Sequence, residues 1–181
     1  MKYIQDQPSL LSQVECQDLM YAYDTSDDRA KEGADLVYTE DKGVLIKGPL
    51  ERNVVEKANK FIESYLAKNS FSMVSSKDIR LFEMAVYKKP PGFLHPLHSD
   101  LGISCVDGEL LHQPFVFLIY LNEDFGGGEL FFPTQNYTIT PKTGTAVIFP
   151  IGYIYPHTVF MVTEGQRYYL RAEYVFVGQE S

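Results

Sequence analysis

The chain has 181 residues, of which 45% are hydrophobic and 22% are charged, and 16 basic against 24 acidic side chains give a net charge of −8. These values are typical of one globular domain with a substantial core. The acidic balance argues against nucleic acid as a partner, because nucleic-acid binders carry a basic surface. A small anionic ligand held by a single arginine stays compatible with it.

Cysteine usage and the N-terminal residues indicate the compartment. Cys16 and Cys105 show no C-x-x-C spacing and there is no second pair, so we expect free thiols rather than a disulfide framework or a zinc site. Residues 1–8 are too polar for a signal peptide, and no apolar run approaches the length of a membrane span. We therefore expect a cytoplasmic protein without a membrane partner.

The first third of the chain is predicted to be mainly helical. Ser12 and Glu15 form a capping-box pattern, and an apolar stripe follows it at helical spacing. Residues 24–35 are polar and predict a loop, and residues 44–46 predict a short strand between two glycines. A second helix is expected after Pro49, ending near residues 69–70, with an apolar face of Val54, Ala58, Phe61, Ile62 and Tyr65.

From about Ile79 the hydrophobic period changes from 3.6 to 2, which indicates strands. Turn signals such as Pro90-Pro91-Gly92 and Gly126-Gly127-Gly128 separate the apolar runs. The runs lie at residues 82–86, 115–121, 130–132, 137–139, 146–149, 158–160 and 168–177. Short strands at this spacing favour a sandwich or jelly-roll. We expect a single domain, residues 1–181, in which residues 1–78 give mainly helical support and residues 79–178 form a jelly-roll core.

One constellation of side chains suggests metal chemistry. His98 and Asp100 are two residues apart, so on an extended chain they project from the same face. His157 can complete the set from another strand, and two histidines with one carboxylate suit a non-haem ferrous oxygenase. Arg167, ten positions after His157, would be a fixed cation for an acidic co-substrate.

Several motifs occur in a fixed order around these residues. They are Tyr87, His98-x-Asp100, Tyr120-Leu121-Asn122, Gly127-Gly128-Glu129, the run from Gly144 to Pro150, His157 and Arg167-Tyr168. Over about residues 79–177 this order resembles the 2-oxoglutarate- and Fe(II)-dependent dioxygenases, in the branch similar to prolyl 4-hydroxylases. The resemblance implies a double-stranded β-helix, or jelly-roll, packed against the N-terminal helices.

The resemblance also implies roles for individual residues. His98, Asp100 and His157 would hold Fe(II), while Arg167 and Tyr120 would bind the distal carboxylate of 2-oxoglutarate and Tyr87 would lie near its keto-acid end. Val159, two residues after His157, would line the pocket wall. The implied reaction converts 2-oxoglutarate and O₂ to succinate and CO₂ and hydroxylates an unactivated C–H bond, with ascorbate as an optional reductant.

The substrate-binding residues depart from the family pattern. Such prolyl hydroxylases commonly carry a tryptophan six residues after the co-substrate arginine, where this chain has Glu173, and the chain contains no tryptophan. Residues 101–109 also offer no arginine. Glu173 and Asp107, if they face the iron, would favour a cationic or hydrogen-bond-donating substrate.

Three functional alternatives stay open. The substrate is a peptide or protein side chain, or it is a free amino acid or other small metabolite, or the jelly-roll binds a metal or ligand without turnover. The nucleic-acid demethylases that share the iron set have a second arginine six residues after the first, whereas Arg171 lies at +4. We expect His95 on the rim of the site, His112 in solvent, the triple glycine in a turn rather than a phosphate cradle, and residues 88–97 in a loop at the substrate entrance.

Overall fold

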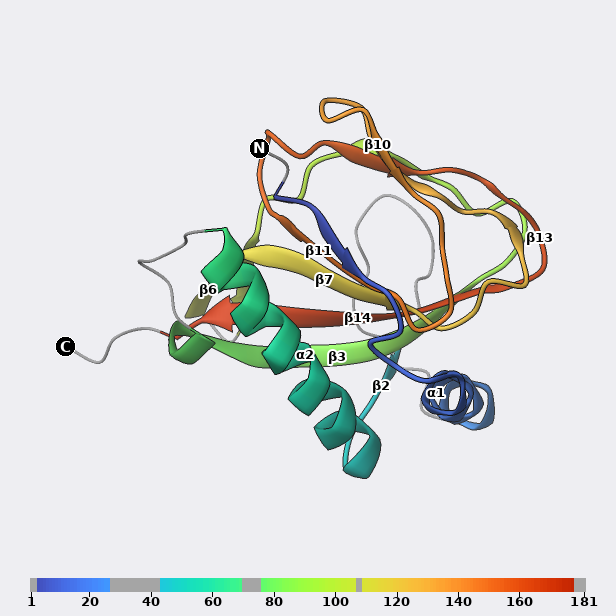
Figure 1. The fold of residues 1–181 in the computed structure, drawn as a ribbon, viewed down its shortest axis with the longest axis horizontal. Coiled ribbons are helices and arrows are strands. Elements are labelled where there is room, and N and C mark those ends of the chain that lie inside the picture. Colours follow the sequence, from blue (N-terminus) through green and yellow to red (C-terminus); the bar gives the residue numbers. More distant parts are fainter. Residues whose placement is uncertain (1–2, 27–42, 70–75, 107–108, 178–181) are drawn as a thin grey trace.

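The computed structural model describes residues 3–26, 43–69, 76–106 and 109–177 (Figure 1). Both expected helices are present, as α1 (Gln13–Thr25) and α2 (Pro49–Lys68). The capping box is formed, since the Glu15 backbone N–H donates to the Ser12 hydroxyl at 3.3 Å and the Ser12 N–H donates to the Glu15 carboxylate at 2.7 Å. Most of the polar segment predicted as a loop, residues 27–35, lies outside the described residues.

Glu15 also joins the two helices. Its carboxylate accepts from Lys57 Nζ at 2.5 Å and from the Asn53 side-chain amide at 2.6 Å, both on α2. Burial would raise the pKa of Glu15, but these donors, together with those of Ser12, outweigh it and lower the pKa to about 2. One carboxylate therefore caps α1 and holds α2 beside it.

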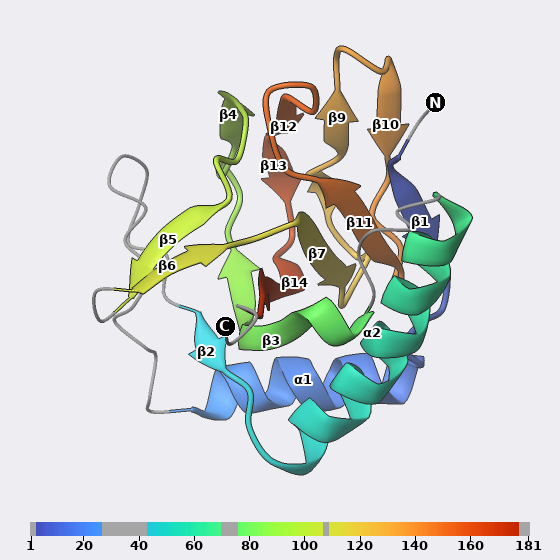
Figure 2. The same ribbon diagram turned by 90° about the vertical axis from the view of Figure 1, so that its left-hand side faces the viewer.

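The strands form two main antiparallel sheets. The larger sheet has the order β1 (Gln5–Gln7), β11 (Ala146–Pro150), β7 (Phe115–Tyr120), β14 (Arg167–Phe176), β3 (Ile79–Lys89) and β2 (Val44–Leu45). The smaller has the order β10 (Tyr137–Ile139), β9 (Leu130–Phe132), β12 (His157–Val159) and β4 (His95–His98). Figure 2 shows the smaller sheet on the side away from the helices. This arrangement confirms the predicted mainly-β, jelly-roll class.

The remaining short elements lie outside the two main sheets. The strand β13 (Val162–Glu164) pairs with β8 (Gly126–Gly127), β5 (Ile103–Val106) pairs with β6 (Glu109–His112), and a 3₁₀ turn spans Ser76–Asp78. Neither described helix combines the length and apolar character needed to cross a membrane.

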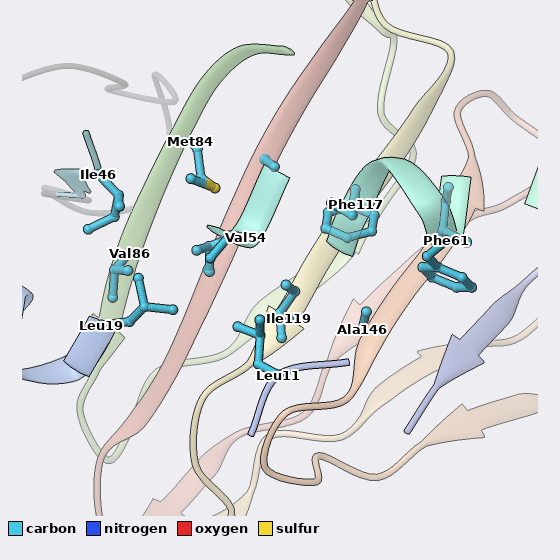
Figure 3. Packing of buried hydrophobic residues seen from close by; sticks show 14 of the residues in the cluster. Leu11, Leu19, Ile46, Val54, Phe61, Met84, Val86, Phe117, Ile119 and Ala146 are labelled. Atoms are coloured by element: carbon cyan, nitrogen blue, oxygen red, sulfur yellow. The ribbon is translucent and has the colours of Figure 1, made fainter. Parts of the chain in front are cut away.

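The six-stranded sheet separates two hydrophobic cores. On one face, alternate residues of β7 such as Phe117 and Ile119 pack against α1 and α2 (Figure 3). On the other face Val116, Leu118 and Tyr120 point between the two sheets. Because both faces of the sheet are covered, β7 is apolar throughout and its six residues are all buried. The site described next lies on the face between the sheets.

Parts of the structure differ from the sequence-based expectations. The strand β1 is polar and carries no hydrophobic alternation, yet it pairs with β11. Residues 88–97 are not a loop throughout, because β3 runs to Lys89 and β4 begins at His95. The turn between them is fixed by Val162, which accepts from the Gly92 N–H at 2.7 Å and donates to the Phe93 carbonyl at 2.8 Å.

Candidate metal centre and co-substrate pocket

Two histidines face each other across the smaller sheet. His98 on β4 and His157 on β12 are direct partners in the antiparallel register, and their ring centroids are 4.2 Å apart. The Nδ1–H of His98 donates to the Pro96 carbonyl at 2.9 Å, and that of His157 donates to the Tyr155 carbonyl at 3.1 Å. Since a carbonyl only accepts, each Nδ1 carries the proton and each Nε2 presents a lone pair, as a metal ligand requires.

Asp100 completes the group. Its Oδ2 lies 3.5 Å from His157 Nε2, and one ligand atom from each of the three residues lies within 4.8 Å of the others. Nitrogen and oxygen ligands lie about 2.0–2.2 Å from a divalent metal, so two ligands of one ion are about 3–4 Å apart. The three side chains predicted from the sequence are therefore brought together at a spacing that one ion can bridge.

The protonation of His157 suits the same purpose. Burial lowers the pKa of its imidazole, His98 lowers it further, and Asp100 opposes both. The ring is therefore kept neutral, which is the form that binds a metal.

A buried cation lies on the large sheet, on its face towards the smaller sheet. Arg167 begins β14 and is 2% exposed, and its guanidinium carbon is 4.4 Å from the ring centroid of Tyr169 and 5.4 Å from that of Tyr120. Among the described residues, neither Nε of Arg167 nor the Tyr120 hydroxyl has a hydrogen-bond partner of good geometry. Burial raises the pKa of Tyr120 more than Arg167 lowers it, so the hydroxyl stays a neutral donor. Buried donors without partners are costly, and an acidic ligand such as 2-oxoglutarate would satisfy both.

The backbone around Arg167 is shaped to hold its side chain. The Asn122 side chain accepts from the Tyr168 N–H at 2.8 Å and donates to the Gln166 carbonyl at 2.7 Å, so it fixes the residues on both sides of Arg167. Gly128 has φ +73°, and a Cβ there would lie 3.1 Å from Arg167 Cδ. The predicted turn is therefore not what forms at the triple glycine, because Gly126 and Gly127 belong to β8, and Gly128 after them leaves room for the arginine stem.

Tyr87 and Val159 both face the space between the sheets. Tyr87 is the register partner of Tyr169, and the two rings stack with centroids 5.2 Å apart. Val159 is buried in the core between the sheets, although the β4–β12 pairing has a bulge between it and His157. The roles expected for them, Tyr87 near the keto-acid end of 2-oxoglutarate and Val159 on the pocket wall, stay predictions.

The two residues predicted to contact the substrate are Glu173 and Asp107. Glu173 is on the pocket face of β14, but its carboxylate accepts from Gln113 Nε2 at 2.9 Å and pairs with Arg171 Nη2 at 3.2 Å. Burial alone would lower the pKa of Arg171, yet the carboxylates of Glu173 and Asp100 outweigh it and raise the pKa. Glu173 therefore has internal partners, which removes the main reason to expect a cationic substrate. Asp107 lies outside the described residues.

The other two histidines are not part of the group. The His95 ring packs on His98 with centroids 3.9 Å apart, and its carbonyl accepts from the Thr158 hydroxyl at 2.7 Å. His112 is exposed at the end of β6.

The sequence reasoning missed Lys89. It is 2% exposed at the end of β3 and is the register partner of Arg167. The signal was present, because strand alternation places Lys89 on the same face as Tyr87, whereas its neighbour Lys88 points the other way and pairs with Asp24 at 2.9 Å.

Comparisons with known proteins agree with this geometry. The sequence profile of the 2OG-Fe(II) oxygenase superfamily matches residues 82–172. Human prolyl 3-hydroxylase 3 is 40% identical over 40% of this chain, and the match spans 12% of that relative. This chain therefore corresponds to a small part of the curated relative.

Two solved structures share the fold over nearly the whole chain. The viral collagen prolyl hydroxylase of Paramecium Bursaria Chlorella virus-1, in its 2OG complex, has a TM-score of 0.72 at 19% identity and covers 98% of this chain and 97% of its own. A prolyl-4-hydroxylase of Pseudomonas putida has a TM-score of 0.72 at 19% identity and covers 98% and 95%.

Proposed function

Because the chain belongs to the 2OG-Fe(II) oxygenase superfamily, we propose that it is an Fe(II)- and 2-oxoglutarate-dependent prolyl hydroxylase that acts on a peptide or protein. The observation that carries the proposal is the grouping of His98, Asp100 and His157, with ligand atoms within 4.8 Å of one another, in a chain that also buries Arg167. The prolyl substrate is supported by the curated prolyl 3-hydroxylase relative and by the collagen and prolyl-4-hydroxylase names of the structural neighbours.

Three side chains form the expected iron site. His98, Asp100 and His157 would hold Fe(II), and their set of two neutral nitrogens and one carboxylate leaves positions for a keto acid and O₂. When bound, iron and 2-oxoglutarate supply the oxidising power, and the balanced outcome is C–H to C–OH with 2-oxoglutarate and O₂ converted to succinate, CO₂ and the hydroxyl oxygen.

Other side chains position the co-substrate. Arg167 offers a planar pair of donors to a carboxylate, and the neutral Tyr120 hydroxyl adds a third donor from the neighbouring strand. The rings of Tyr87 and Tyr169 stack on each other, and that of Tyr169 lies against the guanidinium of Arg167. A charged co-substrate is therefore held by fixed donors in an environment of low dielectric constant.

The first test is binding. Anaerobic addition of 2-oxoglutarate to the Fe(II)-loaded protein should give the weak visible charge-transfer band of a chelated keto acid. The band should be lost in His157→Ala and weakened in Arg167→Ala, while His112→Ala, an exposed histidine, should behave like the wild type. Iron binding without a band would contradict the co-substrate assignment. If every variant, His157→Ala included, still binds iron, the metal site is contradicted.

The second test concerns the substrate. Proline-containing peptides and free amino acids should be compared for succinate formation and for a gain of one oxygen by mass spectrometry. Hydroxylation of peptides alone supports the proposal, whereas turnover of free proline or another metabolite would indicate a small-molecule hydroxylase. Fragmentation or NMR of the product then distinguishes the 3 and 4 positions of the ring. We also propose ascorbate as the reductant, which should prolong turnover without changing the product.

A further inference from the structure

The exposure of side chains along β14 indicates where the pocket opens to solvent. Arg167 is 2% exposed, whereas the side chain of Arg171, four residues later, is 33% exposed. The register partner of Arg171 on β7 is Leu118, which belongs to the core between the sheets, so Arg171 lies on that same face. The side chain of Asp100, whose charge acts on Arg171, is 24% exposed as well. The end of the pocket that solvent reaches is therefore the end at which Arg171 lies.

A chain of polar contacts holds the Arg171 side chain in place. Its Nη2 is 3.2 Å from Glu173 Oε1, and the other oxygen of Glu173 accepts from Gln113 Nε2 at 2.9 Å. The Gln113 backbone N–H donates at 2.7 Å to the carbonyl of Gly102, two residues after Asp100. A Cβ on Gly102, which has φ +66°, would lie 2.8 Å from the Gln113 carbonyl oxygen, so the two segments approach closely. The segment that carries Asp100 is thus linked to Arg171 through Gln113 and Glu173.

The charges around Arg171 indicate which kind of group it can bind. Burial alone would lower the pKa of Arg171, yet the carboxylates of Glu173 and Asp100 outweigh burial and raise it. Two negative charges therefore already balance this cation, and a third carboxylate would be repelled by both. A guanidinium has five N–H donors, and the ion pair with Glu173 is made through Nη2. A neutral acceptor such as a peptide carbonyl can bind the guanidinium without adding charge.

Building on the proposed function, we propose that Arg171 is a substrate-binding residue that donates to a backbone carbonyl of the peptide next to the hydroxylated residue. Glu173 and Gln113 are positioning residues for it, because they fix the guanidinium on the pocket face of β14. The contact favours a peptide over a free amino acid, since the carboxylate of a free amino acid would be repelled by Glu173 and Asp100.

The test separates substrate binding from co-substrate binding. Steady-state kinetics follow hydroxylation of the proline-containing peptide with the highest turnover in the comparison above, acetylated and amidated at its ends. Arg171→Gln should raise the KM for this peptide at least tenfold and change the KM for 2-oxoglutarate less than twofold, because it removes a charge-assisted hydrogen bond to the peptide alone. Arg171→Lys keeps the charge but not the planar fork, so its peptide KM should be intermediate. Arg80→Gln, which removes an exposed arginine from β3, should match the wild type.

A peptide KM within twofold of the wild type in folded Arg171→Gln would overturn the inference while leaving the proposed function intact. An equal rise in the KM for the peptide and for 2-oxoglutarate would also overturn it, because Arg171 would then shape the site as a whole. A wild-type protein that hydroxylates free amino acids but no peptide would instead refute the proposed function, and with it this role of Arg171. Circular dichroism verifies folding. Where Arg171→Gln does not fold, an unchanged peptide KM in Arg171→Lys overturns the inference.

Discussion

Replacing Lys89 with methionine removes a buried ammonium group while keeping most of the stem, and its effect on stability should depend on pH. In the folded chain the pKa of Lys89 is lowered from 10.5 to about 8, first by burial and then by Arg167. This lowering of the pKa corresponds to a free-energy penalty of about 3 kcal/mol on the charged form of Lys89 in the folded state. The penalty is fully present below pH 8, where the lysine is charged in both states.

As pH rises from 8 towards 10.5, the folded state releases this proton before the unfolded state does. The unfolded state then binds more protons, so the free energy of unfolding of the wild type rises with pH. Integrated between pH 7 and 9.5, the gain is about 2 kcal/mol. Lys89→Met lacks this group, so it should lack this gain.

Urea unfolding of the ligand-free protein in the presence of a chelator, followed by circular dichroism at several pH values, measures the effect. The quantity to compare is the difference in free energy of unfolding between wild type and Lys89→Met at each pH, because the tyrosines titrate in both proteins. Parallel curves within about 0.5 kcal/mol would show that Lys89 is not held in an environment that disfavours its charge.

Three further predictions concern the pocket. Tyr120→Phe removes a buried hydroxyl that has no hydrogen-bond partner of good geometry in the described part of the chain. It should therefore leave the melting temperature unchanged or higher while weakening 2-oxoglutarate binding about tenfold in calorimetry. Gly128→Ala should destabilise the protein by about 1–3 kcal/mol in urea unfolding and weaken the same binding, because the new Cβ meets both the Phe125 ring and Arg167 at a positive φ. Gly48→Ala, with φ +77° and open space around its Cβ, is the matched control and should lose stability alone. Chelation should lower the melting temperature of the Fe(II)-loaded wild type by several degrees but leave His157→Ala unmoved, and an equal shift in both would place the metal elsewhere.

Local patterns carried most of the fold prediction. The capping box at Ser12 and the apolar stripe after it located α1, and the change of hydrophobic period at Ile79 located the start of β3. The strand β1 was missed because Gln5-Asp6-Gln7 shows no apolar alternation, and its pairing with β11 depends on main-chain hydrogen bonds that any sequence can make.

Some features of the candidate site could be predicted from the sequence and others could not. The spacing of His98 and Asp100 and the distance from His157 to Arg167 were visible in the sequence, because each depends on strand geometry alone. The state of Glu173 was not visible, because it depends on Gln113, which is 60 positions away. Strand alternation could have placed Lys89 on the same face as Tyr87, but its position opposite Arg167 depends on the β3–β14 register, which the sequence does not show.

The side chains of β14 alternate between the two faces of the large sheet, and this alternation determines the effect of substitutions along the strand. Even-numbered positions such as Tyr168 and Tyr174 are embedded beneath the helices, where their hydroxyls donate to Asp24 and Asn59. Odd-numbered positions such as Arg167 face the pocket. A saturation scan of residues 167–174 should therefore alternate by parity, with even positions governing cellular abundance and odd positions governing turnover at normal abundance. Inserting one residue near the start of the strand would exchange the two roles and abolish both.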